Sequence, residues 1–370
     1  MKRAASPMLA SSEPSSKRRT VLTELPAPGA TNAIATLPTN KFQYQRQVVY
    51  QQPTEVACFT YDGERQVHVN SSEGLKPFIP LDLKQKTYDL SIGFPDGLVQ
   101  QAVVAEHLDA FVQTCNPSKL PNPPAICTWR GIMTKLCATP YSTDKYTFVA
   151  TRWKGTVYIS ELITASSKGG NTDRDKRFMY FGYKFEQYAT STDWNSIINT
   201  NEQYCSIFKT KLGETSLLLG GEVDCMMSPE KPTQSPQTVY AELKTSRIIT
   251  DFRGKTSFHR HKLMKIWLQS FLAGVPVVLC AFRDDNGLVK SVETYETKNI
   301  PRMARSVLQA ESWDANVCLA FGDAILNLLK KSITKEGEVF GVGYDGGKEV
   351  KIWPLSVEYQ FLPESFLQKE

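Results

Sequence analysis

Two acidic residues stand inside a segment that otherwise predicts a buried β-strand, and they constrain the fold more than any other feature. Residues 217–225 have the sequence LLLGGEVDC, in which Glu222 and Asp224 flank Val223. Side chains alternate between the two faces of a strand, so both carboxylates should point to one face and Val223 into the core. Unpaired buried carboxylates are costly, so a compensating group is expected beside them.

A second segment, YAELKTS at residues 240–246, supplies a complementary charge. Glu242 and Lys244 share one face of the expected strand, and Leu243 lies on the opposite face. If the two strands are neighbours, three carboxylates and one ammonium group converge, and a divalent cation would neutralise the excess negative charge. Mg²⁺ and Mn²⁺ prefer such oxygen ligands. The alternative is that both segments are exposed faces of surface strands, but their apolar neighbours favour central strands.

The remaining chain mixes strand and helix patterns without regular βαβ alternation, which predicts a single α/β or α+β domain around a mixed sheet. Apolar or alternating runs predict strands at residues 55–61, 156–162, 239–249 and 275–285. Gly213 punctuates a hairpin whose second arm contains the two acids, and residues 229–237 form a proline-rich polar loop. Apolar residues at helical spacing predict helices over residues 98–114, 260–274 and 311–331.

Residues 1–40 are rich in Ser, Pro, Ala and Thr, and their composition predicts a disordered tail before a catalytic domain at residues 41–370. Two basic clusters in this tail, Lys2-Arg3 and Lys17-Arg18-Arg19, are typical of a two-part nuclear import signal. The alternative is a solvated basic tail. We expect a nuclear protein that also occurs in the cytoplasm.

Bulk composition excludes several other classes. No segment approaches the roughly 20 apolar residues that a membrane span requires, so no membrane association is expected. The 8 cysteines show no regular spacing, which favours reduced thiols in a cytosolic or nuclear protein and makes a zinc site improbable. A formal net charge of +5 suits a polyanionic partner.

The order Asp, then Glu-x-Lys, on adjacent strands is the arrangement found in restriction-endonuclease-like nucleases. Asp224 and Glu242 are separated by a stretch long enough for a loop and a returning strand. In such sites the carboxylates hold one or two metal ions that lower the pKa of an attacking water. The lysine orients that water or stabilises charge on the phosphoryl oxygens. We therefore expect Glu222, Asp224, Glu242 and Lys244 to be catalytic.

Six segments together resemble the DXO-type decapping exoribonucleases, whose fungal nuclear relatives bind a processive 5′–3′ exoribonuclease. They occur in family order as TWRGIMTKL (128–136), YFGYKFEQY (180–188), NEQYCSI (201–207), GGEVDC (220–225), YAELKTS (240–246) and RHKLMKIWLQSFLAGVP (260–276). The resemblance implies a restriction-endonuclease-like core of two mixed β-sheets with surrounding helices and an active site in the cleft between them. It also implies metal-dependent removal of incomplete, unmethylated, NAD-type or FAD-type caps and of 5′-triphosphate from RNA, with onward 5′–3′ exonuclease activity.

The same resemblance implies a role for each matching residue. The binding of two Mg²⁺ or Mn²⁺ ions is implied for Glu186, Glu222, Asp224, Glu242 and the carbonyl of Leu243. Substrate binding is implied for Trp129, Arg130, Gly131, Cys205, Glu222, Lys244 and Gln269. From the residues alone, Glu186 lies on a strand-like run and could equally be an ordinary surface acid. Arg130 could form a structural salt bridge, Cys205 could be a buried thiol, and Gln269 could be a polar residue on a helix surface.

Two rival functions remain open from the sequence. The chain could be mainly a non-catalytic partner that stabilises a 5′–3′ exoribonuclease, although the complete acid and lysine set argues against a degenerate site. It could also be a DNA endonuclease of the same fold. The segments around Arg130 and Gln269 instead favour a protein that acts on RNA 5′ ends. Further basic residues could line a groove that follows an RNA backbone or form a solvated helix face. These are Arg253, Lys255, Arg260, Lys262 and Lys265.

Overall fold

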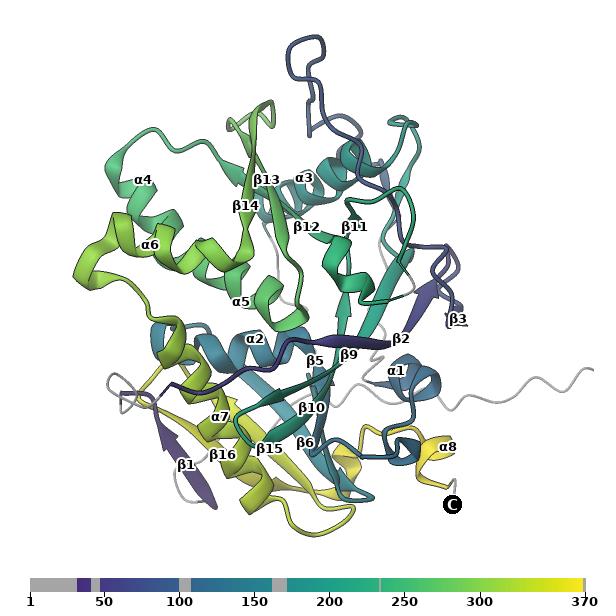
Figure 1. Ribbon diagram of the computed structural model, residues 1–370, viewed down its shortest axis with the longest axis vertical. Helices are drawn as coiled ribbons and strands as arrows, with labels where there is room; N and C mark the ends of the chain where they lie inside the picture. Colours follow the sequence, from purple (N-terminus) through teal and green to yellow (C-terminus); the bar gives the residue numbers. More distant parts are fainter. Residues whose placement is uncertain (1–31, 41–46, 100–107, 162–171, 233, 369–370) are drawn as a thin grey trace, which may run out of the picture.

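A computed structural model describes residues 32–40, 47–99, 108–161, 172–232 and 234–368 of the chain. Two mixed β-sheets dominate these residues (Figure 1). The larger, ten-stranded sheet has the order β1-β16-β15-β6-β7-β5-β10-β9-β2-β3, and the smaller has the order β11-β12-β13-β14. Parallel pairs (β5 with β7 and β10, and β12 with β13) lie among antiparallel ones, which confirms the predicted mixed α/β class.

The strands of the large sheet are, in spatial order, β1 Ala35–Pro38, β16 Glu349–Leu355, β15 Val339–Tyr344, β6 Tyr146–Trp153, β7 Thr156–Glu161, β5 Ile126–Trp129, β10 Thr215–Glu222, β9 Gln203–Leu212, β2 Thr54–Tyr61 and β3 Val67–Val69. Those of the small sheet are β11 Cys225–Met226, β12 Tyr240–Arg247, β13 Val277–Arg283 and β14 Val289–Glu296. A separate parallel pair joins β4 Leu98–Val99 to β8 Ile198–Asn199.

Helices cover both faces of each sheet. The described helices are α1 Asp109–Thr114, α2 Arg130–Ala138, α3 Asp173–Thr190, α4 Phe252–Ser257, α5 Leu263–Ala273, α6 Ile300–Leu308, α7 Ala315–Ser332 and α8 Glu364–Leu367. The largest core joins β5 and β10 of the large sheet through α2, α5 and α7 to β13 of the small sheet. Helix α3 packs on the other face of the small sheet, against Leu243 and Leu279. The small sheet therefore lies between α3 and α5, as Figure 1 shows.

The hairpin predicted around Gly213 is confirmed as β9 and β10, with Gly213 in the left-handed region at φ 56°. The leucines of β10 are buried on both faces because α2 and α7 cover one side and α1 the other. The predicted strand at residues 275–285 corresponds to β13. The helix predicted to end at Gly274 is α5, whose C-terminal cap is Gly274 at φ 70°.

Two predictions differ from the structure at the N-terminal side. Within the helix predicted over residues 98–114, Leu98 and Val99 form β4, and described helical structure begins only at Asp109. Residues 100–107 lie outside the described residues. Within the tail predicted over residues 1–40, Ala35–Pro38 forms β1 and pairs with β16 at the edge of the large sheet. The prediction is wrong for these four residues, and residues 1–31 lie outside the described residues.

The acidic segment connects the two sheets. Strand β10 ends at Glu222 in the large sheet, and β11 begins at Cys225 in the small sheet, where it pairs with β12 through Cys225 and Ala241. The segment that carries the acids is therefore a neighbour of β12, as considered above, but only from Cys225 onward, because Glu222 belongs to the large sheet. The acids lie at the place where the chain crosses from one sheet to the other. No helix in the described part of the chain is long and apolar enough to cross a membrane.

Candidate active site

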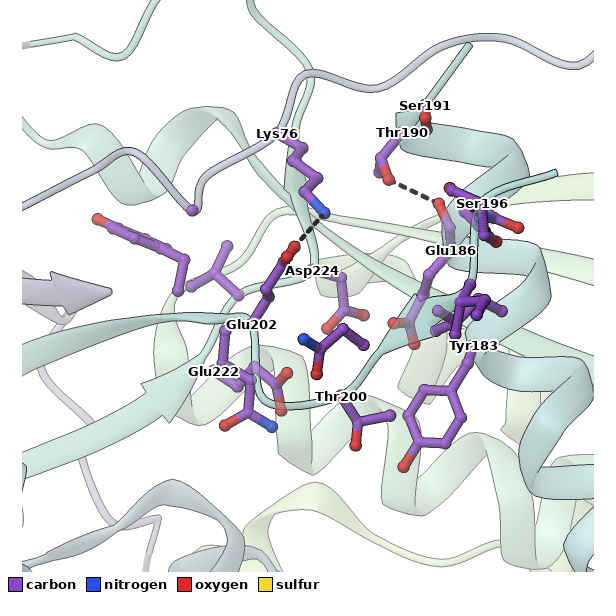
Figure 2. A pocket seen from close by; sticks show the side chains of 18 residues that line it. Lys76, Tyr183, Glu186, Thr190, Ser191, Ser196, Thr200, Glu202, Glu222 and Asp224 are labelled. Carbon is purple, nitrogen blue, oxygen red and sulfur yellow. Dashed lines mark hydrogen bonds and ion pairs between the residues drawn. The ribbon is translucent and has the colours of Figure 1, made fainter. Parts of the chain in front are cut away.

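Three of the predicted acids face one cavity of about 280 Å³. Glu222 comes from the end of β10, Asp224 from the crossover, and Glu186 from α3. Figure 2 shows their carboxylates directed into this cavity. The prediction that Glu186 lies on a strand-like run is wrong, because it belongs to an α-helix that begins with a capping box between Thr172 and Asp175. Aromatic residues with high β-propensity around Glu186 conceal the helical period.

Two glycines make room for Trp129, the last residue of β5, and for Arg130, the first residue of α2. A Cβ atom on Gly220 would lie 2.6 Å from the Phe111 ring and 2.7 Å from the Trp129 ring. A Cβ atom on Gly221 would lie 3.3 Å from Nε of Arg130. The Gly-Gly pair that precedes the acids therefore allows Trp129 and Arg130 to lie directly against β10.

The fourth acid, Glu242 on β12, is buried in a network of donors beside the cavity. Its Oε2 accepts a hydrogen bond of 2.9 Å from Nη1 of Arg130. Its Oε1 accepts bonds of 2.5 Å from Nζ of Lys244 and 2.6 Å from Nε2 of Gln269. Residues from β12, α2 and α5 thus converge on one carboxylate, and the predicted substrate residues Arg130 and Gln269 adjoin the predicted catalytic pair.

Asp224 connects this network to the cavity. Its Oδ2 accepts a hydrogen bond of 2.7 Å from the backbone N–H of Leu243 and lies 3.8 Å from Nζ of Lys244. The predicted acids, lysine and Leu243 are therefore brought together around one point. They come from both sheets and from α3.

The electrostatics of the cluster reflect an excess of negative charge. Burial and the neighbouring Glu242 raise the pKa of Asp224 to about 7. Burial, Asp224 and Glu222 raise the pKa of Glu186 well above its usual value. The pKa of Glu222 is also raised, with the surrounding protein as the largest cause, but this effect is reduced because the residue is exposed to solvent. Protonated carboxyl groups are poor metal ligands, and a cation bound beside the cluster would favour their charged forms.

The two cations beside Glu242 lower the pKa of this carboxyl group, in contrast to the raised values of the other acids. Burial alone would raise the pKa of Glu242, but the charges of Arg130 and Lys244 outweigh it, so that its pKa is lowered. Burial alone would lower the pKa of Lys244, but Glu242 and Asp224 raise it. Glu242 and Lys244 are therefore both charged at neutral pH.

Comparison with known proteins identifies the family of this arrangement. Residues 51–367 match the family described as RAI1 like PD-(D/E)XK nuclease. The chain belongs to the RAI1-like PD-(D/E)XK nuclease family. This match confirms three predictions: the family, the nuclease class of enzyme and the restriction-endonuclease-like fold.

Relatives in the RAI1-like family include animal and fungal proteins. The human "Decapping and exoribonuclease protein" is 35% identical over 321 residues, covering 81% of this chain and 80% of the relative. The Neurospora crassa "Decapping nuclease RAI1" is 34% identical over 332 residues, covering 83% and 79%.

Solved structures of RAI1-like proteins share the fold. Candida albicans Rai1, in complex with pU5-Mn²⁺, superposes with a TM-score of 0.78 at 25% identity, covering 90% of this chain and 98% of that one. S. pombe Rai1, in complex with 3′-FADP, gives a TM-score of 0.75 at 26% identity, covering 87% and 99%.

The donor set of this RAI1-like chain fits a hard divalent cation in chemistry. Among the described residues no group of three or more His, Cys, Asp or Glu side chains lies close enough together, as placed, to hold a metal ion. Both oxygens of Glu242 are engaged by Arg130, Lys244 and Gln269. Burial and the neighbouring carboxylates nevertheless raise the pKa values of Glu186 and Asp224, and a cation bound there would offset this negative charge. Oxygen donors with such excess charge suit Mg²⁺ or Mn²⁺.

The remaining predicted substrate residues occupy different environments. Trp129 is half-buried, and its ring contacts Phe111 edge to face with centroids 5.6 Å apart. Gly131, on the first turn of α2, is exposed, and a Cβ atom there would meet nothing within 4 Å. Cys205 is buried on β9, in register with Glu222. Gly131 therefore has open space around it, whereas Trp129 lies opposite Gly220 and Cys205 opposite Glu222 in the large sheet.

The basic residues around α5 do not form one free row. Arg260 is paired with Glu311, and Lys265 is paired with Asp144. Lys262 donates a hydrogen bond of 2.5 Å to the carbonyl of Thr245. These interactions favour the alternative that the three residues belong to an ordinary helix face and do not line a groove for an RNA backbone.

Several residues that line the 280 Å³ cavity, called the acid cavity below, were not predicted from the sequence. They include Lys76, Tyr183, Thr190, Ser196, Asn199, Thr200 and Glu202 (Figure 2). Tyr183 could have been predicted from the sequence, because it precedes Glu186 by three residues and a helical assignment would have put both on one face. Lys76 was not, since only the fold brings its Nζ to 3.6 Å from Oε2 of Glu202.

Proposed function

We propose that this chain is a metal-dependent hydrolase of RNA 5′ ends. It removes incomplete, unmethylated and NAD- or FAD-type caps and 5′-triphosphate, and it degrades the RNA onward in the 5′–3′ direction. The family assignment and the relatives named as decapping nucleases support this proposal. Complexes of similar proteins with pU5-Mn²⁺ and with 3′-FADP support the choice of RNA and of non-canonical caps.

The observation that supports the proposal best is the meeting of Glu186, Glu222 and Asp224 at one cavity beside the Glu242–Lys244 pair. We assign metal binding to these four acids and to the carbonyl of Leu243, with two Mg²⁺ or Mn²⁺ ions. Bound ions would supply a more acidic water and neutralise charge on the phosphate. The side chain of Glu242 would have to exchange part of its present hydrogen bonding on binding them.

The side chains of the network then hold and orient the substrate. Lys244 has an ammonium group that is charged and lies beside both Asp224 and Glu242, so it stabilises negative charge on a phosphoryl oxygen. Arg130 has one buried donor, Nε, with no hydrogen-bond partner among the described residues. An unpaired buried donor is costly, and a phosphate oxygen would satisfy it.

The flanking residues complete the proposed substrate site. The amide of Gln269, which here donates to Glu242, would contact an RNA group from α5, and Gly131 leaves room for the substrate at the start of α2. Trp129 and Cys205 support this wall of the site. We further propose that residues 41–370, together with β1, act as one catalytic domain.

The decisive experiment is a substrate panel assayed with a double variant. Matched RNAs with triphosphate, unmethylated cap, methylated cap, NAD and monophosphate 5′ ends are incubated with the protein in Mg²⁺ or Mn²⁺, and the released products identify the bond cut. Glu222→Ala combined with Asp224→Ala should abolish every activity. If the folded double variant still hydrolysed capped RNA, the proposed mechanism would be wrong.

Two finer proposals concern partners and location. The protein can also bind a 5′–3′ exoribonuclease, and it acts in the nucleus and the cytoplasm, as the basic clusters at residues 2–3 and 17–19 suggest. Both clusters lie outside the described residues. Co-purification with an exoribonuclease, compared with the activity of the isolated chain, separates a scaffolding role from a catalytic one.

A further inference from the structure

A second cavity, rich in arginine, lies at the N-terminal end of α3. Its volume is about 590 Å³. Its lining includes Phe94, Arg174, Arg177, Phe178, Arg247 and Asp285. None of these residues lines the acid cavity, and α3, β12 and the β13–β14 turn contribute most of them.

The cavity has more positive than negative charge. Its two acids already have partners, since Asp285 is 2.7 Å from Nη2 of Arg247 and Asp173 is 3.5 Å from Nζ of Lys176. Arg174 and Arg177 have no acidic partner within the described ranges, although Arg177 donates to the carbonyl of Asn286.

A further arginine lies directly behind the lining. Arg283 is buried at 6% exposure, and its Nε has no hydrogen-bond partner among the residues described. Its pKa is lowered mainly by burial; Asp285 raises it, and Arg247 and Arg177 lower it further. An anion bound beside these arginines would offset their mutual repulsion.

Aromatic rings accompany the arginines. Phe178 has two guanidinium groups near its ring, with Cζ of Arg283 4.3 Å and Cζ of Arg174 5.3 Å from the ring centroid. Phe94 lines the same cavity and is half-buried. Arginines that contact phosphates, combined with rings on which bases stack, are the combination that binds single-stranded nucleic acid.

Helix α3 connects the arginine cavity to the acid cavity. Glu186 lies toward its C-terminal end and Arg177 nine residues earlier, which corresponds to about 14 Å along the helix axis. Nine residues are also about two and a half turns, so Arg177 leaves α3 on the side opposite Glu186, and the path around the helix is longer than this axial distance. An RNA of several nucleotides whose 5′ end occupies the acid cavity can reach the arginines.

We propose that the arginine cavity binds the phosphodiester backbone and bases of the RNA substrate several nucleotides 3′ of its 5′ end. This proposal rests on the proposed function, since it assumes that the 5′ end lies among the acids. Under this proposal, Arg174 and Arg247 cause the protein to bind long RNA more tightly than short RNA.

The test measures binding of RNA of two lengths in buffer containing a chelator. A 3′-fluorescent 12-nucleotide RNA with a 5′-monophosphate is followed by anisotropy, and a 5′-phosphorylated dinucleotide is measured as its competitor. Each phosphate contact contributes about 0.7 to the slope of log affinity against log salt for single strands. Arg174→Gln should therefore reduce that slope by about 0.7 and weaken 12-mer binding on the order of eightfold at 50 mM salt. Arg247→Gln should act in the same direction.

Two controls make the result specific. The dinucleotide should bind the variants as it binds the unmodified chain. Arg302→Gln removes an equal charge from an exposed position on α6 and should leave 12-mer binding unchanged. Thermal unfolding midpoints confirm that the variants are folded.

Three results would overturn the proposal: unchanged 12-mer binding by both cavity variants, an equal loss for dinucleotide and 12-mer, or an equal loss in Arg302→Gln. Hydrolysis by the unmodified chain is assayed separately. Length-dependent loss of binding without any hydrolysis would reject the proposed function and still support the arginine cavity.

Discussion

Arg130 and Glu242 form a buried ion pair, with Nη1 2.9 Å from Oε2 and side-chain exposures of 7% and 2%. The pair joins the first residue of α2 to the central part of β12, and hence the large sheet to the small sheet. Removal of one partner from such a pair leaves a buried charge without compensation. The pair is therefore both a structural connection and part of the candidate active site.

The first prediction concerns this pair. Arg130→Gln should lower the free energy of unfolding by about 3 kcal/mol, because Glu242 loses its strongest cationic neighbour. Lys135→Gln is the matched control on the same helix, since its 2.6 Å pair with Glu161 is exposed at 43% and 54%. That change should cost less than about 1 kcal/mol. Equal costs in urea denaturation would contradict the structural role of the buried pair.

The second prediction concerns pH in the absence of divalent ions. The pKa of Asp224 is raised to about 7 in the folded chain, so the folded state binds this proton more tightly than the unfolded state. Its contribution to stability is fully present below the unfolded pKa of about 3.9 and is lost as the pH rises to about 7. Each unit of pKa difference is worth about 1.4 kcal/mol.

Asp224→Asn provides the comparison for this prediction. The asparagine oxygen can still accept the hydrogen bond from Leu243. Asparagine does not titrate, so the unmodified chain should lose stability relative to this variant as the pH rises from 4 to 7. The measured quantity is the difference between their free energies of unfolding. A difference that stays constant over this range would exclude a raised pKa at Asp224.

The third prediction concerns metal binding. A divalent ion at 100 times its dissociation constant should stabilise the folded chain by about 2.7 kcal/mol. Mn²⁺ should therefore raise the unfolding temperature of the unmodified chain, and this shift should vanish in Glu222→Gln combined with Asp224→Asn. Glu202→Gln removes an acid that lines the same cavity but pairs with Lys76, and it should retain the shift. A shift that survives in the double variant would place the ion elsewhere.

The fourth prediction concerns two glycines. Gly220→Ala would place a methyl group against the rings of Phe111 and Trp129 and should cost about 1–3 kcal/mol. Gly131→Ala meets no neighbour within 4 Å and lies in α2, so stability should be unchanged or increase by up to about 1 kcal/mol. Because Gly131 is proposed to face the substrate, its alanine variant should raise KM for RNA. A stable Gly131→Ala variant with an unchanged KM would remove this residue from the substrate site.

The sequence allowed prediction of the elements around the acids but not of their arrangement. Period-two alternation and the turn at Gly213 locate β9 and β10, because these are local properties of the chain. Alternation shows which residues share a face, but it does not show which sheet a strand joins. For that reason the crossover between Glu222 and Cys225 was not predicted.

The helical setting of Glu186 was obscured for a related reason. Tyr180, Phe181, Tyr183 and Phe185 are aromatic residues that favour strands locally, whereas packing of α3 on the small sheet favours a helix. The partners of Glu242 depend on α2 and α5, which are distant in sequence, so their geometry required the fold.

The crossover at Glu222 and Asp224 also limits how this protein can open. These acids lie where the two sheets are joined by a covalent connection of a few residues. Any sliding of one sheet past the other would pull the acids out of alignment and break the Arg130–Glu242 pair. Substrate entry and product exit must therefore leave the two sheets docked, so that the chemistry and the rigidity of the domain depend on the same short stretch of backbone.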